Sequence, residues 1–125
     1  MKFRALLWLL SIFMKKAARK NPDFQKQLKD KDFAFQIKTE DGSAIRAYKI
    51  KDNQVYSKRS GLNHPAFTIS FKDADTGVRI LTSKDKNAFM RGIQEKDIVI
   101  TGDLSLVMWF QSISKYLKPQ GKKKR

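Results

Sequence analysis

The chain contains two short segments, Ala88-Phe89-Met90-Arg91-Gly92 and Ile98-Val99-Ile100-Thr101-Gly102-Asp103-Leu104, in which glycines follow apolar runs. Gly92 is placed to end a short helix. Gly102 is placed to turn the chain after a strand, so that Asp103 can cap the next helix. From Asp73 to Leu117 we therefore expect two helices, a strand and a last, very apolar helix. This block carries no catalytic residue set and indicates an apolar helix that closes a core or a cavity.

Upstream of this block, apolar residues alternate with polar ones at the period of two that is typical of half-buried strands. Strands are expected at residues 32–39, 44–50, 54–58 and 66–71, and a fifth at 96–101. The first three are joined by short turns, which predicts an antiparallel meander. Asn21-Pro22 is expected to separate a first helix from a short second one.

Composition excludes several classes of site. The 125 residues suit one domain, and there is no Cys and only one His, His64. Disulfides, thiol nucleophiles, Cys-based metal sites and multi-histidine sites are therefore excluded. No nucleophile elbow, phosphate-cradling loop or metal-ligand cluster is present. We expect no enzyme, no cofactor and no metal.

The net charge of +15 is concentrated at the two ends of the chain. Residues 1–22 and 104–125 each carry six basic residues and no acid, whereas the middle holds 15 basic against 12 acidic residues. Basic ends favour polyanions, either nucleic acid or an anionic membrane surface. Because no nucleic-acid-binding motif accompanies the charge, no specific nucleic acid is expected.

The first twenty residues form an apolar and basic helix. Residues 3–14 are too short a run to span a bilayer, and the basic residues after them, with no small-residue cleavage site, argue against a secretory signal peptide. One interpretation is a helix in the membrane interface; the other is a helix packed on the domain or on a second copy. The two are compatible if the helix releases on membranes. The residues predicted to contact membrane are Phe3, Leu6, Leu7, Trp8, Leu10, Phe13, Lys15, Lys16, Arg19 and Lys20.

The order of elements over residues 23–117 resembles the sterol carrier protein type two family of lipid-binding domains. The likeness is carried by the strand Phe67–Phe71 with its acidic helix start, and by the spacing of Gly92 and Gly102 around one strand. The resemblance implies an α+β fold, a five-stranded, mostly antiparallel sheet with helices on one face that enclose an apolar tunnel. It implies binding of fatty acyl, sterol-like or isoprenoid quinone lipids, and bacterial relatives include carriers of quinone intermediates. The chain departs from the family in ending Lys-Lys-Lys-Arg, where animal members carry a peroxisomal signal, and in its N-terminal helix.

On this resemblance the chain divides into an N-terminal helix (1–20), a sterol-carrier-like lipid-binding domain (21–118) and a basic tail (119–125). A lipid tunnel needs apolar, adaptable walls. The same residues would serve equally well to fill a core. The residues predicted to bind lipid are Phe35, Ile69, Phe71, Phe89, Met90, Ile100, Leu106, Val107, Met108 and Phe110.

The predicted function is non-catalytic lipid binding or transfer by a cytoplasmic protein peripheral to the inner membrane. The expected partners are a lipid ligand and an anionic membrane surface. The alternative is an adaptor without bound lipid that docks on a membrane, on a lipid-handling enzyme or on a second copy of itself. A nucleic-acid-binding protein, favoured by the charge alone, ranks below both.

Overall fold

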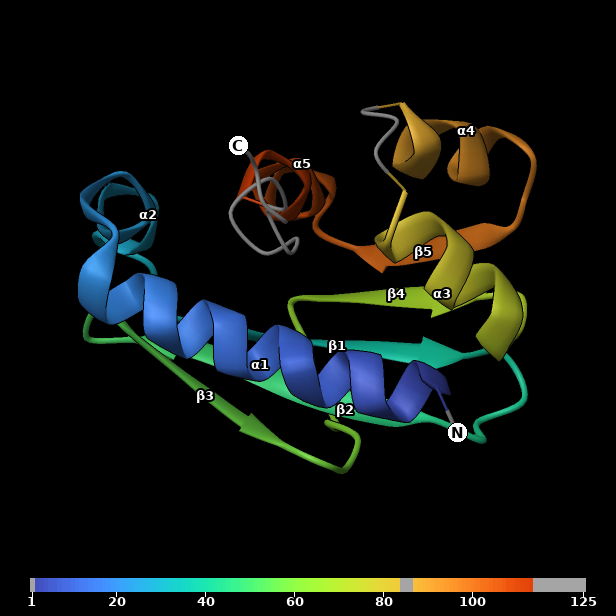
Figure 1. Ribbon diagram of the computed structural model, residues 1–125, viewed down its shortest axis with the longest axis horizontal. Coiled ribbons are helices and arrows are strands. Elements are labelled where there is room, and N and C mark those ends of the chain that lie inside the picture. Colours follow the sequence, from blue (N-terminus) through green and yellow to red (C-terminus); the bar gives the residue numbers. More distant parts are fainter. Residues whose placement is uncertain (1, 84–86, 114–125) are drawn as a thin grey trace, which may run out of the picture.

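The computed structural model describes residues 2–83 and 87–113. These residues form five helices and five strands (Figure 1). In chain order they are α1 (Lys2–Lys20), α2 (Pro22–Leu28), β1 (Phe33–Thr39), β2 (Ile45–Lys51), β3 (Gln54–Lys58), β4 (Phe67–Phe71), α3 (Ala74–Leu81), α4 (Ala88–Gln94), β5 (Ile98–Gly102) and α5 (Leu104–Ile113). The predicted helix end at 114–117 and the basic tail lie outside the described residues.

The strands form one sheet in the order β3-β2-β1-β4-β5. Every neighbouring pair is antiparallel except β1 and β4, which run parallel with Ile37 opposite Ile69. The parallel pair arises because the connection after β3 returns across the sheet, where the backbone N–H of Leu62 donates to Gln36 Oε1 at 2.8 Å. The α+β class and the mostly antiparallel sheet predicted from the sequence are confirmed.

The helices cover one face of this sheet. α1 lies across β1, β2 and β3, and α3, α4 and α5 lie over the β4–β5 half (Figure 1). The covered face carries the odd-numbered side chains of β1 and β4, among them Phe35, Ile37 and Phe67, all of which are buried. Alternation along the strands therefore sorts apolar side chains toward the helices.

α1 is an integral part of the core. Phe3, Leu7, Leu10 and Met14 are all buried. The hydroxyl of the buried Tyr48 donates to the backbone carbonyl oxygen of Leu7 at 2.8 Å. The packed position is one of the two interpretations that the sequence left open. No helix within the described residues is long and apolar enough to cross a membrane.

The cap of α5 agrees with the sequence, and a second aspartate caps α3 in the same way. Asp73 accepts from the Thr76 N–H at 2.8 Å, and Asp103 accepts from the N–H of Ser105 at 2.9 Å. Gly102 has φ +103°, and a Cβ there would overlap the carbonyl oxygen of Ala66, so only glycine fits this turn.

One local prediction, the role of Gly92, is wrong. Gly92 does not end its helix, because α4 continues to Gln94 and Gly92 is buried inside it. A Cβ at Gly92 would lie 2.8 Å from Ile98 Cδ1, so this glycine lets α4 approach β5 closely. Trp109 of α5 is buried, and its indole N–H donates to the Gln27 carbonyl oxygen at 2.8 Å.

Candidate functional site

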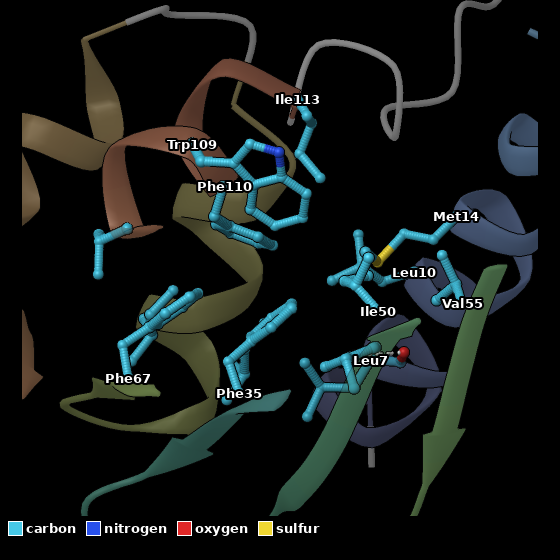
Figure 2. Close-up of a cluster of buried hydrophobic side chains, with 14 of the residues drawn as sticks. Leu7, Leu10, Met14, Phe35, Ile50, Val55, Phe67, Trp109, Phe110 and Ile113 are labelled. Atoms are coloured by element: carbon cyan, nitrogen blue, oxygen red, sulfur yellow. Dashed lines mark hydrogen bonds between the residues drawn. The ribbon is translucent and has the colours of Figure 1, made fainter. Parts of the chain in front are cut away.

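An aromatic cluster fills the space between the sheet and α5. The Phe35 ring stacks on Phe67 at 4.6 Å between centroids and meets Phe110 at 5.5 Å. Phe33 packs edge-on against Trp109 at 5.1 Å. Figure 2 shows the α5 side chains on one side of the core and those of α1 and its neighbouring strands on the other. These rings occupy the place where the tunnel was expected.

The predicted lipid-binding residues fall into three groups by burial. Five are buried: Phe35, Ile69 and Phe71 of the sheet, and Val107 and Phe110 of α5. Four are half-buried and lie on α4, β5 and α5: Phe89, Met90, Ile100 and Leu106. Met108 is 45% exposed and stands apart from the others.

The half-buried group marks a corner of the molecule where the core is incompletely covered. Ile100 pairs with Ile69 across β4 and β5 on the helix-covered face. Above them Phe89 of α4 contacts Phe110 of α5, with ring centroids 6.4 Å apart. Half-buried Leu106 packs against the same core. We call Phe89, Ile100, Leu106 and Phe110 the α4–α5 corner.

On the described part of the chain, two surface pockets lie away from this corner. One is lined by Arg4, Leu7, Gly42, Ser43, Ile45, Arg46 and Arg59. The other, at the C-terminal end of α1, is lined by Phe13, Lys16, Ala17, Lys20, Asn21 and Pro22. The apolar tunnel therefore stays a prediction that depends on rearrangement of the aromatic cluster.

The predicted membrane-contact residues divide between the inside and the outside of the fold. Phe3, Leu7 and Leu10 are buried, and Leu6 and Phe13 are half-buried. The exposed ones are Trp8, Lys15, Lys16, Arg19 and Lys20. Leu9 and Ile12, which were not among the predicted residues, are also exposed. α1 thus uses one face for the core and presents a second face that is both apolar and basic.

Three aromatic residues of the cluster were missing from the predicted list: Phe33, Phe67 and Trp109. Phe33 shares the alternation of Phe35, and Phe67 shares that of Ile69, so the strand pattern contained their signal. Trp109 shares the helical spacing of Leu106, Phe110 and Ile113, so the period of α5 contained its signal too.

The shifted pKa values belong to structural contacts. Burial raises the pKa of the Tyr48 hydroxyl well above its usual range. A hydrogen bond from the Ser43 backbone N–H, together with the Thr39 hydroxyl, lowers the pKa of Asp41 to about 2. Hydrogen bonds from Thr76 lower the pKa of Asp73, and those from Ser105 lower that of Asp103. The carboxylates are thus engaged in turn and helix capping.

Comparison with family models gives no match, and no curated protein matches the sequence. Solved structures do match. The UbiJ-SCP2 ubiquinone synthesis protein superposes with a TM-score of 0.67 at 14% identity, over 88% of this chain and 90% of that one. The sterol carrier protein domain 2 of Helicoverpa armigera gives 0.64 at 13% identity, over 92% and 88%. Palmitated SCP2L2 from Aedes aegypti gives 0.58 at 16% identity, over 85% and 91%. Over most of its length, the chain therefore has the fold of the sterol carrier protein type two domains.

Proposed function

We propose that the protein binds a lipid chain at the α4–α5 corner and carries it without catalysing a reaction. The observation that carries the proposal is the set of half-buried apolar side chains at this corner, within a fold shared with sterol carrier domains. The matched proteins are described as a sterol carrier, a palmitated protein and a ubiquinone synthesis protein. We infer the same ligand classes here: a fatty acyl, sterol-like or isoprenoid quinone chain.

Binding requires the corner to open. Phe89 and Phe110 come from different helices and meet at a centroid distance of 6.4 Å, so parting them gives access to Ile69 and Ile100. A ligand that binds only the open form shifts the population toward it. Each Å² of apolar surface that the bound lipid chain removes from water contributes about 25 cal/mol to the binding free energy, which offsets the lost contact between the two rings.

The outer face of α1 is proposed to hold the protein at an anionic membrane. Trp8 is 51% exposed, and Leu9 and Ile12 are exposed beside it. Four exposed basic residues follow on the same helix: Lys15, Lys16, Arg19 and Lys20. Tryptophan favours the membrane–water interface, and each basic residue near an anionic surface contributes about 1 kcal/mol.

A docking adaptor that binds no lipid is the second candidate function. It is favoured by the aromatic filling of the core, in which Phe35 contacts both Phe67 and Phe110. In that case the apolar side chains of α5 only complete the fold, and the exposed face of α1 is the functional surface.

A matched pair of variants on β5 tests lipid binding. Ile100 faces the helices, whereas the neighbouring Val99 faces the opposite side and is 44% exposed. We expect Ile100→Gln to weaken uptake of a fluorescent long-chain fatty acid by about tenfold, because a polar amide would be buried against the chain. Val99→Gln is the control and should bind like the unmodified protein. Equal uptake by both variants would contradict binding at this corner.

A further inference from the structure

Three arginines from distant segments of the chain line one pocket. Arg4 lies on α1, Arg46 on β2, and Arg59 directly after β3. The pocket has a volume of about 300 Å³, at the lower end of the usual range for small-ligand sites. Its remaining lining is the backbone turn at Gly42 and Ser43 and the apolar side chains of Leu7 and Ile45.

Hydrogen bonds hold two of the guanidinium groups in place. Arg4 donates from Nε and Nη2 to the carbonyl oxygen of Ser43, at 3.0 and 2.6 Å. Arg46 donates from Nη1 to the hydroxyl oxygen of Ser57 at 2.8 Å. Each bond leaves several N–H donors of its guanidinium uncommitted. Arg59 is exposed at the rim of the same pocket.

The pocket lacks a matching negative charge. Within residues 2–83 and 87–113, the one ion pair joins Arg79 and Asp97, so none of the three arginines is paired with a carboxylate there. The carboxylate of Asp41, in the adjacent turn, accepts instead from the Thr39 hydroxyl and the Ser43 N–H, at 2.7 and 2.9 Å. Three permanently charged groups repel one another, and an anion placed among them would remove that repulsion.

We propose that Arg4, Arg46 and Arg59 form a binding site for a phosphate group. Guanidinium groups bind carboxylates and phosphates through paired N–H donors. A terminal phosphate presents three acceptor oxygens where a carboxylate presents two, so it suits a site lined by three arginines. The phosphate comes either from a soluble phosphorylated compound or from a phospholipid headgroup that ends in a phosphomonoester.

The position of Arg4 on α1 connects the pocket to the exposed face of that helix. Arg4, Trp8 and Ile12 follow one another at a spacing of four residues, which places them along one side of the helix. A headgroup bound by the arginines would therefore lie at the N-terminal end of the outer face of α1. Binding of a phospholipid headgroup by these arginines rests on the membrane contact proposed above, whereas binding of a soluble phosphate does not.

Titration of the full-length protein with inorganic phosphate, at constant ionic strength in chloride, tests the site. The amide signals of Gly42 and Ser43 report binding by NMR. Arg59→Gln and Arg4→Gln should each raise the dissociation constant for phosphate about tenfold, because each removes charge-assisted donors. Lys49→Gln removes one charge from the opposite face of β2 and should leave the constant unchanged. Dissociation constants that are equal in the unmodified protein and in both arginine variants would overturn the proposal.

A second arm identifies the source of the phosphate. Binding is measured to vesicles that contain phosphatidic acid, whose headgroup is a terminal phosphate, with phosphatidylcholine vesicles as the reference. If Arg59→Gln weakens both phosphate and phosphatidic acid binding, and Lys49→Gln weakens neither, the site takes a lipid headgroup. If only phosphate binding weakens, the site takes a soluble compound. The phosphate titration contains no lipid chain, so its failure overturns this site and leaves lipid uptake at the α4–α5 corner standing.

Discussion

The ring of Phe3 occupies the space that a side chain at position 77 would need. A Cβ built on Gly77 would overlap this ring and would lie 2.8 Å from its Cδ1 atom. Phe3 also packs edge-on against Phe71, with centroids 5.6 Å apart. The first turn of α1 is therefore seated between α3 and the sheet, and Gly77 is the residue that allows this close approach.

Gly77→Ala should lower the free energy of unfolding. Overpacking costs about 1–3 kcal/mol, and this exceeds the gain of about 1 kcal/mol in helix propensity. The measurement is urea unfolding. Phe3→Ala alone should cost about 3–5 kcal/mol. In a double-mutant cycle, the double variant should lose less stability than the sum of the two single losses, because the smaller side chain at position 3 makes room for the Cβ at position 77. Strict additivity would show that α1 and α3 do not touch in this way.

Removing residues 1–20 should unfold the protein, and not merely detach it from membranes. The deletion exposes the partners of four buried side chains: Phe3, Leu7, Leu10 and Met14. At about 1.5–3 kcal/mol each, their loss is comparable to the total stability of about 5–15 kcal/mol expected for a domain. Circular dichroism and thermal melting measure this. A truncated protein that melts like the full chain would contradict the integral role of α1.

Stability should fall as the pH rises above about 10, in part because of Tyr48. Its pKa is raised by burial in the folded state, so above the ordinary tyrosine pKa the unfolded chain releases a proton that the folded one keeps. Tyr48→Phe should cost about 0.5–1.5 kcal/mol at pH 7, through loss of the bond to the Leu7 carbonyl oxygen. Unfolding of the variant should depend less steeply on alkaline pH. An unchanged pH dependence would show that Tyr48 ionises freely in the folded protein.

The outer face of α1 should control membrane binding without contributing to stability. Trp8→Glu with Ile12→Glu should reduce sedimentation with phosphatidylglycerol vesicles by tenfold or more, because it removes interfacial apolar area and adds repulsive charge. Tyr56→Glu, at an exposed position on β3, is the control and should have little effect. Melting temperatures should stay close to that of the unmodified protein for all three substitutions. Equal vesicle binding by the double variant and the control would contradict membrane contact through this face.

Local patterns predicted the regular elements of the fold. Alternation placed Phe35, Ile37 and Ile69 on one face of the sheet, because a buried face imposes a period of two on each strand. Asp103 was recognisable as a cap, since a carboxylate before an apolar run satisfies free N–H groups. Gly92 was misinterpreted because a glycine that ends a helix and one that permits close packing look alike in sequence.

Features that join distant segments were beyond local patterns. The apolar residues of α1 suit a membrane or a core equally, and only the contacts of Phe3 and Leu7 show which they fill here. Arg4, Arg46 and Arg59 lie more than a dozen residues apart from one another in the sequence, so no local pattern predicts that they line one pocket. Whether side chains fill a space or line a tunnel also depends on how helices pack, which spacing does not encode.

Native mass spectrometry of the purified protein, followed by extraction into organic solvent, tests lipid carriage most directly. We predict that the protein carries a bound species of discrete mass that extracts as an acyl, sterol-like or quinone lipid, or that it acquires such a species when these lipids are added. A mass equal to that of the bare chain, unchanged after incubation with all three lipid classes, would contradict the account. The α4–α5 corner would then be part of a filled core, and the exposed face of α1 would be the functional surface.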